Sequence, residues 1–291
     1  MEYVELFIDS FLGVFNWTFR QIVFSVPISE NYFWGLILIS LIVWILELIF
    51  PWRKKQKIFR QGFWLDIFYM FFNFFIFSII IVGFYEVFNK ILFKSFNIRP
   101  DSLALINLNE FSPLFQLIIF FVILDFFQWL THILMHHIPF LWKFHKVHHS
   151  VKEMGFAAHF RYHWMENILY KPLKVFAIML IGGFEPDQAY VIHFFTIIIG
   201  HLNHSNLKFN YGPLKYIFNN PILHLHHHAH SVPNKFKKGV NFAISLSVWD
   251  YIFKTNYVPN SDGNTKLGYQ GDHSMSEDFF GQLLYGFKKG D

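Results

Sequence analysis

Long runs of hydrophobic residues dominate the first two thirds of the chain. The longest runs cover 33–50, 67–85 and 114–134, and two shorter ones cover 173–183 and 189–200. About 20 consecutive apolar residues are enough for a helix to cross the hydrocarbon core of a bilayer. The pattern therefore predicts an all-α, polytopic membrane protein with about four spanning or hairpin helical segments.

Polar residues and turn formers between these runs indicate how the chain is threaded. The first run ends at Pro51, and the loop after it carries five basic residues: Arg53, Lys54, Lys55, Lys57 and Arg60. Basic loops stay on the cytoplasmic side of a membrane, so this loop is expected there. Following the spans from this loop places every histidine cluster on the cytoplasmic side. Gly182, Gly183 and Pro186 predict a hairpin turn between the two shorter runs.

Both ends of the chain are more polar than its middle. Residues 1–30 are apolar but carry spaced charges, which suits an interfacial helix better than a span, and no charged segment precedes them as in a cleaved signal peptide. We expect a first transmembrane hairpin over 31–113, a catalytic domain with membrane helices over 114–259, and a cytosolic tail over 260–291. The tail ends in Lys288-Lys289-Gly290-Asp291, which has the form of a dilysine retrieval signal.

Composition narrows the chemistry that such a protein can perform. Only 15% of the 291 residues are charged, well below the quarter or so typical of soluble domains. The net charge of +4 is small and dispersed, so no footprint for nucleic acid is evident. The absence of cysteine excludes disulfides, thiolate metal sites, iron–sulfur clusters and thiol catalysis. Any metal must therefore be held by nitrogen or oxygen, and the chain has 17 histidines.

The first histidine cluster lies at the cytoplasmic end of the third long run. His132 and His136 are four residues apart, so both rings share one face of a helix and can point at one ion. Asp125 and Trp129 lie on the same face. The carboxylate is placed where it can accept the second ring N–H of a ligating histidine.

Two further clusters repeat an H-x-x-H-H spacing. They consist of His145, His148 and His149, and of His224, His227 and His228, with His226 as a bystander; His201 and His204 precede the second of them. Pro139 is expected to end one helix and start the next between the first two clusters. Ten candidate ligands exceed the four that a tetrahedral zinc needs, so two ions fit the count. Imidazole binds iron, copper, nickel and zinc, so the ligand type does not select the metal.

The remaining histidines have more than one interpretation. His137, His226 and His230 adjoin the clusters and can be ligands, supporting groups or solvent-facing residues. His193 shares a helical face with His201, so it can line a cavity or simply bond a buried carbonyl. We treat His159, His163 and His273 as non-ligands.

These clusters, the first two close together, resemble the histidine boxes of the fatty acid hydroxylase/sterol desaturase superfamily. The resemblance extends from Asp125 to Thr255. It includes Leu141-Trp142, Arg161, Glu166, His204-Ser205-Asn206, Pro221, Asn241, Trp249-Asp250, Phe253 and Thr255. Leu225 and Lys238 depart from the pattern, where an arginine is usual and where an acidic residue often stands, respectively.

The resemblance implies a membrane enzyme with two iron ions that uses dioxygen as co-substrate to hydroxylate or desaturate a lipid. A fatty acyl chain, a sterol-like lipid or an ether lipid is a possible substrate class, in a bacterial inner membrane or the endoplasmic reticulum. The ten histidines of the clusters are the implied ligands. Asp125, Trp129, Arg161, Glu166, Asn241 and Asp250 are candidates to support them.

Electrons for such a reaction must come from outside the chain. The sequence has no G-x-G-x-x-G loop, no haem-attachment motif and no cysteine. A small cytochrome b-type or ferredoxin-type carrier with its reductase is therefore the expected partner. Basic residues near the second cluster can meet an acidic carrier, or can instead contact lipid phosphates: Lys143, Lys146, Lys152, Arg161 and Lys171.

Two other functions compete with oxidation. A histidine-rich metal transporter or sensor would need ionisable residues in mid-span, where His193 is the nearest candidate and stands almost alone. A metalloprotease would need H-E-x-x-H or an equivalent base, and the sequence lacks that motif. Hydroxylation and desaturation remain alternatives because both begin with the same hydrogen abstraction.

Overall fold

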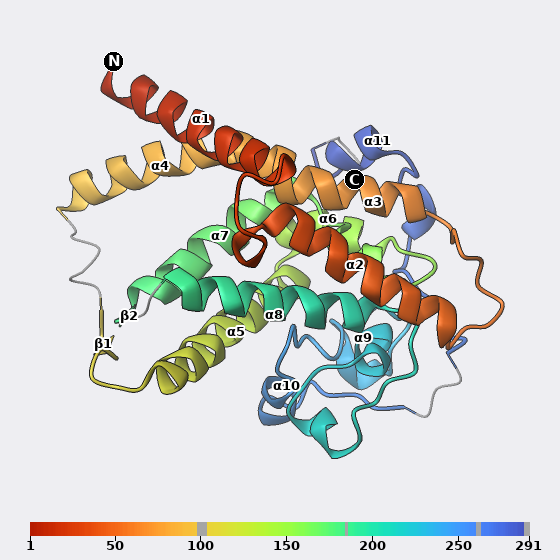
Figure 1. The fold of residues 1–291 in the computed structure, drawn as a ribbon. Helices are drawn as coiled ribbons and strands as arrows, with labels where there is room; N and C mark the ends of the chain where they lie inside the picture. Colours follow the sequence, from red (N-terminus) through yellow and green to blue (C-terminus); the bar gives the residue numbers. More distant parts are fainter. Residues whose placement is uncertain (98–103, 184–185, 260–262, 288–291) are drawn as a thin grey trace.

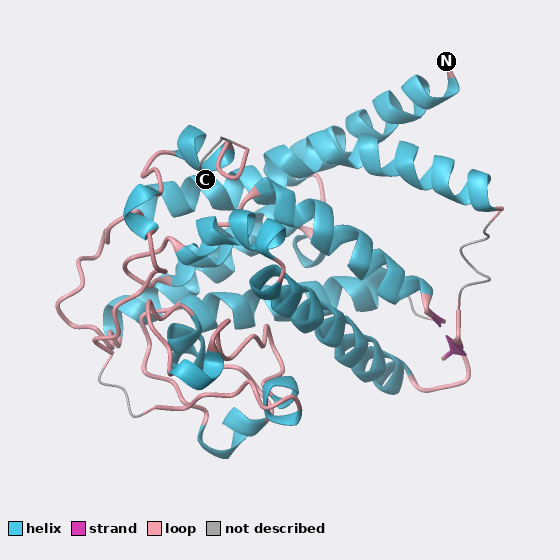
Figure 2. Cartoon of the chain, turned by 180° about the vertical axis from the view of Figure 1, so that it is seen from behind, coloured by secondary structure: helices cyan, strands magenta, loops and turns pink. Residues whose placement is uncertain are grey.

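The protein is described by a computed structural model that covers residues 1–97, 104–183, 186–259 and 263–287; the dilysine motif lies outside them. The fold is mostly helical, as expected (Figures 1 and 2). Its helices are α1 (Glu2–Ile22), α2 (Tyr32–Ile49), α3 (Phe63–Phe71), α4 (Phe77–Phe96), α5 (Pro113–His137), α6 (Pro139–His149), α7 (Trp164–Met179), α8 (Pro186–His204), α9 (Pro221–His227), α10 (Val248–Ile252) and α11 (Phe279–Leu283). Short 3-10 turns cover Ile28–Glu30, Phe156–Phe160, Gly212–Tyr216, Asn234–Phe236 and Asp272–Ser274.

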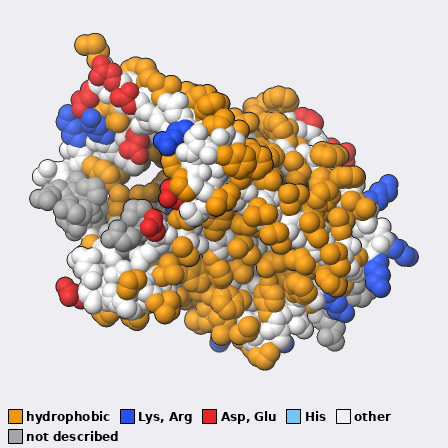
Figure 3. All heavy atoms as spheres, in the orientation of Figure 1, with side chains coloured by type: hydrophobic (Ala, Val, Ile, Leu, Met, Phe, Trp, Pro, Cys, Tyr) orange, Lys and Arg blue, Asp and Glu red, His pale blue; other side chains and the backbone are white. Residues whose placement is uncertain are grey.

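Among the described residues, three helices are long and apolar enough to cross a membrane, which confirms the expected membrane protein. They are α2, the continuous helix Phe63–Phe96 and α5. Their outer faces expose large apolar side chains, such as Leu38, Ile42 and Ile45 of α2 at about half of their full area. The side of the molecule in Figure 3 is accordingly covered mainly by hydrophobic atoms, with basic side chains at the right edge, where Figure 1 places the connection from α2 to α3. The cytoplasmic location of that connection stays a prediction.

The second span differs from the expected run in length and regularity. It extends beyond 67–85 at both ends, and a π-helical turn, Phe72–Ile76, joins α3 to α4. Such a turn widens the helix locally and is frequent at functional sites. Here it presents Asn73, whose Nδ2 donates to the carbonyls of Phe160 and Tyr162 at 3.0 and 2.9 Å. The turn thereby fastens the second span to the segment before α7.

Helix ends follow the capping residues of the sequence. Asn31 accepts from the Trp34 amide to begin α2, and Ser112 followed by Pro113 begins α5. Ile138 in an extended conformation separates α5 from α6, which starts at Pro139 as expected. α5 therefore ends directly after His136 of the first cluster, and α6 carries the second cluster.

The two shorter runs form α7 and α8. In Figure 1, α7 runs toward β2 (Ile181–Gly182), and α8 returns from that end of the molecule; residues 184–185 of the expected turn lie outside the described residues. Strand β2 pairs in parallel with β1 (Ile106–Asn107), a small departure from an all-helical fold. α1 is not among the candidate spans and lies along α4 (Figures 1 and 2). Its interfacial location stays a prediction, as does the dip of α7 and α8 into the membrane.

Candidate metal centre

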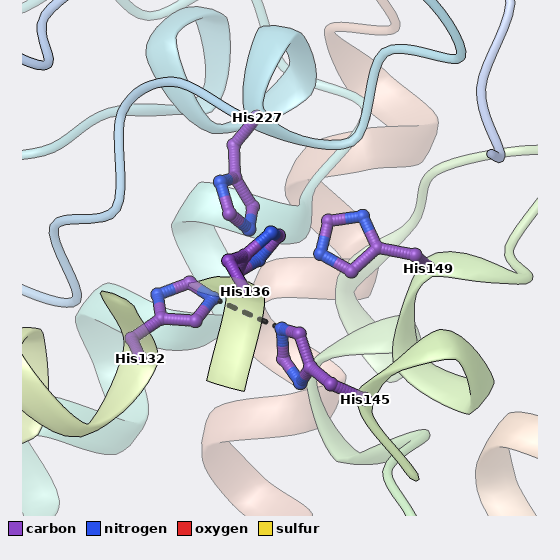
Figure 4. Close-up of side chains that lie close together, drawn as sticks. All are labelled: His132, His136, His145, His149 and His227. Atoms are coloured by element: carbon purple, nitrogen blue, oxygen red, sulfur yellow. Dashed lines mark hydrogen bonds between the residues drawn. The ribbon is translucent and has the colours of Figure 1, made fainter. Parts of the chain in front are cut away.

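Five histidines from three helices converge on one point. His132 and His136 come from α5, His145 and His149 from α6, and His227 from α9. Figure 4 shows their rings pointing toward one another. Each offers a nitrogen within 4.8 Å of the others, and the Nε2 atoms of His132 and His145 are 3.1 Å apart.

A second group lies directly beside the first. It contains His148 of α6, His204 of α8, and His224 and His228 at the end of α9, all buried. The Nε2 atom of His204 lies 3.3 Å from that of His148 and 3.0 Å from that of His224. The rings of His149 and His228 stack across the boundary with centroids 4.4 Å apart. The two groups thus form one continuous cluster of nine imidazoles.

Helical spacing explains how each box is divided. Seen along the helix axis, the fourth residue after a given one lies about 40° from it in one direction. The third residue after it lies about 60° from it in the opposite direction. Accordingly, His145 and His149 join the first group and His148 joins the second. In the third box, His224 and His228 join the second group while His227 joins the first. Each H-x-x-H-H box therefore serves both groups.

Hydrogen bonds at the outer ring nitrogens fix the tautomers. The Nδ1 atoms of His132, His148, His204 and His227 lie 2.7–2.9 Å from the carbonyls of Phe242, Arg161, Gly200 and Val240, respectively. A carbonyl oxygen only accepts, so Nδ1 carries the proton and Nε2 keeps its lone pair. The lone pairs consequently face the two groups, as in metal-bound histidine.

The donor set fits two transition-metal ions. Ligand nitrogens at about 2.1 Å from one ion lie about 3.0–3.4 Å apart, which matches the Nε2 spacings above. The Nε2 atoms of His136, His149 and His227 are buried without a hydrogen-bond partner among the described residues, as free ligand atoms would be. Burial also lowers the pKa of the His149 and His228 rings well below the ordinary value. These rings are therefore neutral and able to coordinate.

Glu166 is the acid that contacts a histidine of the groups. Its Oε2 lies 3.0 Å from Nδ1 of His145, and both side chains are buried. Burial raises the pKa of Glu166 to about 8. The same carboxylate closes a capping box with His163 at the start of α7. One residue thus holds both a ring of the first group and the helix that follows.

Asp125 does not play the role expected from its helical face. Its carboxylate accepts no hydrogen bond from a histidine ring among the described residues. It accepts hydrogen bonds from the backbone amides of Ser245 and Leu246, both at 3.0 Å, and from Nε1 of Trp249. Asp125 and His132 both contact the loop 242–246, which agrees with the helical face that they share. That loop supplies the Phe242 carbonyl to His132, so Asp125 acts on the group through the backbone.

Asp250 and Asn241 hold the same loop from the other side. Asp250 accepts from the amides of Phe242 and Ala243 and from Nε1 of Trp129, at 2.8–3.1 Å. Asn241 has a φ of 53°, and its Nδ2 donates to the carbonyls of Leu223 and Tyr257. Asp125 and Asp250 therefore bind this loop directly and Trp129 supports Asp250. Asn241 directly precedes the loop and ties its start to Leu223 and Tyr257.

Arg161 acts through its main chain and a buried ion pair. Its carbonyl accepts from His148, while its guanidinium pairs with Asp66 of α3, which also pairs with Arg60. In the same region Glu47 of α2 accepts the amides of Phe156 and Asn206. Sequence analysis missed Asp66 and Glu47. Their signal was an acidic residue within an apolar run, which is costly in a membrane unless it is partnered.

His201 belongs to neither group within the described part of the chain. Its Nε2 lies 2.9 Å from Oγ of Ser40 and its Nδ1 lies 3.0 Å from Nδ1 of His159. Both nitrogens are thus engaged away from the clusters, so we omit His201 from the ligand set. His226 is also outside both groups. His159, treated as a non-ligand, stacks on His204 with centroids 5.3 Å apart.

A cavity of about 430 Å³ leads from the histidine groups toward α1 and α4. Its inner end is lined by His132, His145, His148, His204 and His224. Its walls include Phe74, Phe75, Phe160 and Ile197. His193 also lines the cavity, which is one of the two roles that the sequence allowed for it. Val14 and Trp17 of α1 line its outer part. In Figure 3 the surface is hollowed between the α1–α4 pair and the helices beneath it.

Comparison with known proteins agrees with this geometry. Residues 117–255 match the sequence model of the fatty acid hydroxylase family. The chain is 30% identical over 181 residues to ornithine lipid hydroxylase OlsE of Rhizobium tropici, covering 62% of this chain and 53% of that protein. Identity to alkylglycerol monooxygenase of Homo sapiens is 28% over 145 residues, covering 48% and 30%. Identity to sphingolipid C4-hydroxylase sur2 of Schizosaccharomyces pombe is 26% over 156 residues, covering 53% and 52%.

The chain spans about half or less of the length of these relatives. No solved structure matches it significantly. The matched region nevertheless contains all three histidine boxes and the loop that supports them. Over residues 117–255, which include all three histidine boxes, the chain matches the fatty acid hydroxylase family.

Proposed function

We propose that this protein is a membrane-bound lipid hydroxylase that uses two iron ions and dioxygen to insert one oxygen atom into a C–H bond of a lipid. The observation that carries this proposal is the pair of buried histidine groups at the inner end of a cavity. The relatives described above are named as hydroxylases and monooxygenases, which favours hydroxylation over desaturation.

The two groups would hold one ion each. His132, His136, His145, His149 and His227 would bind the first, and His148, His204, His224 and His228 the second. When bound, the iron ions supply the activation of dioxygen and the abstraction of hydrogen from an unactivated C–H bond. The reaction balances as RH + O₂ + 2e⁻ + 2H⁺ → ROH + H₂O.

The protein's own side chains would position the lipid and keep water away. Phe74, Phe75 and Phe160 provide an apolar wall for an alkyl chain beside the histidine groups. Glu166 holds the His145 ring and can keep a proton beside the first group. A cavity lined in this way orients one part of a substrate toward the cluster and excludes solvent from it.

Electrons would come from a separate carrier that docks near the metal centre, because the sequence has no redox motif of its own. The basic residues considered for docking are not all available. Arg161 is buried in an ion pair with Asp66, and Lys171 lines the cavity. Lys152 pairs with Asp272, and Lys146 contacts the hydroxyl and ring of Tyr285. Among the described residues, Lys143 is therefore the candidate with neither kind of partner.

The proposal is tested by comparing lipids of cells that express the wild-type protein with cells that express His148→Ala or His227→Ala. We expect lipid species heavier by one oxygen atom with the wild type and their loss with both variants. His273→Ala, a histidine outside both groups, is the matched control and should behave as the wild type. An unchanged lipidome with the wild type would contradict the enzymatic function. Rapid exchange of the bound metal on dialysis would favour the transporter instead.

A further inference from the structure

A polar stripe on α7 faces the cavity. It consists of Glu166, Asn167, Tyr170, Lys171 and Lys174. These residues recur at spacings of three and four, so they lie on one side of the helix. The other side exposes Val175 and Phe176. α7 therefore turns its charged side chains toward the cavity and its apolar side chains outward, the opposite of lysines that extend to a membrane surface.

The two lysines of this stripe have no anionic partner among the described residues. Lys171 donates to Oγ of Ser78 at 3.2 Å and lies 5.7 Å from the ring centre of Tyr85. Lys174 makes neither a hydrogen bond nor an ion pair in the described structure. Asp125 is the acid that favours its charge, but the Asp125 oxygens are taken by Ser245, Leu246 and Trp249.

Carboxylates of the cavity lining do not neutralise the lysines either. Glu166 is the acidic residue of that lining, and it is engaged with His145. Two ammonium groups thus line a cavity whose surface is mainly apolar. A charge removed from water is costly unless an opposite charge accompanies it. The cavity is therefore complementary to an anion attached to an apolar chain.

The distance from the metal centre matches a lipid that enters with its chain toward the histidines. Lys171 and Lys174 follow Glu166 by five and eight residues, which is a rise of about 7.5 and about 12 Å along the helix axis. Glu166 itself contacts the first histidine group. An anionic group held by the lysines would place carbon atoms several bonds away beside the two groups.

We propose that Lys174, assisted by Lys171, binds an anionic oxygen group of the lipid substrate, a carboxylate or a phosphate. This contact selects the substrate class and determines which carbon reaches the metal centre. Ser78, Tyr170 and Asn167 supply neutral hydrogen-bonding groups along the same wall. That this lipid is the substrate rests on the proposed function, but its binding to the cavity does not require turnover.

The test is equilibrium binding to the purified, metal-loaded protein in a nonionic detergent, with three lipids of matched chain length and with inorganic phosphate. Hexadecanoate and hexadecyl phosphate carry the anion, hexadecanol lacks it, and inorganic phosphate lacks the chain. We expect both anionic lipids to bind about tenfold or more tighter than hexadecanol, as for a charge-assisted contact. Lys174→Met should reduce their affinity to that of hexadecanol, and Lys174→Arg should retain it.

Lys90→Met is the matched control because Lys90 pairs with Glu2 and does not line the cavity; it should not change any affinity. Metal content per chain checks that each variant is folded, and Lys174→Gln replaces Lys174→Met if the latter loses its metal. Equal affinity for hexadecanol, or an anion preference that survives neutralisation of Lys174, would overturn the proposal. Inorganic phosphate binding as tightly as hexadecyl phosphate would overturn the assignment to a lipid. An unchanged lipidome with the anion preference intact would contradict the proposed function and leave this inference standing.

Discussion

A substitution at Glu166 distinguishes the two metal sites most clearly, because Glu166 contacts one ring of the first group, that of His145. Its Oε2 lies 3.0 Å from Nδ1 of His145, whereas His148, His204, His224 and His228 have no contact of this kind with it. Replacing Glu166 by Gln keeps the size of the side chain and an oxygen that can accept the ring N–H. Gln has a single oxygen, so once that oxygen accepts the ring N–H, the 3.4 Å bond from the His163 amide to Oε1 is lost. A metal ion bound through His145 would favour the ionised form of Glu166, so in the metal-loaded protein the substitution removes the negative charge together with this one capping bond.

The expected effect is a selective loss of metal from the first group. Removing a partner of a metal-bound histidine typically lowers metal affinity 10- to 100-fold, or about 1.4–2.8 kcal/mol. We expect Glu166→Gln at the lower end of this range, because a neutral acceptor is roughly half as strong as a charged one. Glu166→Ala should lie at the upper end and should also destabilise α7 by about 1 kcal/mol through loss of the cap.

Titration with a chelator of graded strength, read by mass spectrometry of the retained metal, measures this effect. The wild type should release its two ions at neighbouring chelator concentrations, and Glu166→Gln should release one ion about tenfold earlier. Glu5→Gln, on the exposed part of α1, is the control. Equal weakening of both ions, or no weakening of either, would refute the assignment of Glu166 to the first group.

Three further predictions concern the surroundings of the centre. His163 accepts the Met165 amide and donates to Leu283, so only its neutral form fits, and burial lowers its pKa to about 4. The contribution of neutral His163 to the free energy of unfolding, about 3 kcal/mol, should be complete above pH 6.5 and should be lost as the pH falls toward 4. Hydrogen exchange of α11 should follow this pH dependence in the wild type and should lose it in His163→Asn. Asp250→Ala leaves buried donors unpaired and should lower the free energy of unfolding by about 3 kcal/mol or more in denaturant titrations. Gly200→Ala would place Cβ against the His159 ring and should displace that ring. Since His159 lines the cavity, a reduced affinity for hexadecanoate should result.

The spans and the histidine boxes were predictable because each depends on local order in the sequence. The run 114–134 contains enough apolar residues to define α5, and Pro139 correctly marks the break before α6. Spacings of three and four place ligands on common helical faces, and the structure brings nine of the ten together. Such features need no knowledge of how distant segments pack.

The supporting contacts were not predictable in the same way, because they join residues far apart in the chain. Asp125 lies on the expected face of α5, but the loop that it binds follows it by 120 residues. Ser40 engages His201 across 161 residues, which removes a histidine that spacing alone had included. Lys174 stands in an apolar run, and only the fold shows that it faces the cavity.

We expect each of the two neighbouring histidine groups to hold one metal ion. Metal content of the purified protein, measured by mass spectrometry alongside His136→Ala and His204→Ala, tests it most directly. We predict about two iron ions per chain in the wild type and about one in each single variant, because each substitution removes a ligand from one group. A wild type that binds one ion or none under iron-replete conditions, or single variants that retain both ions, would contradict it.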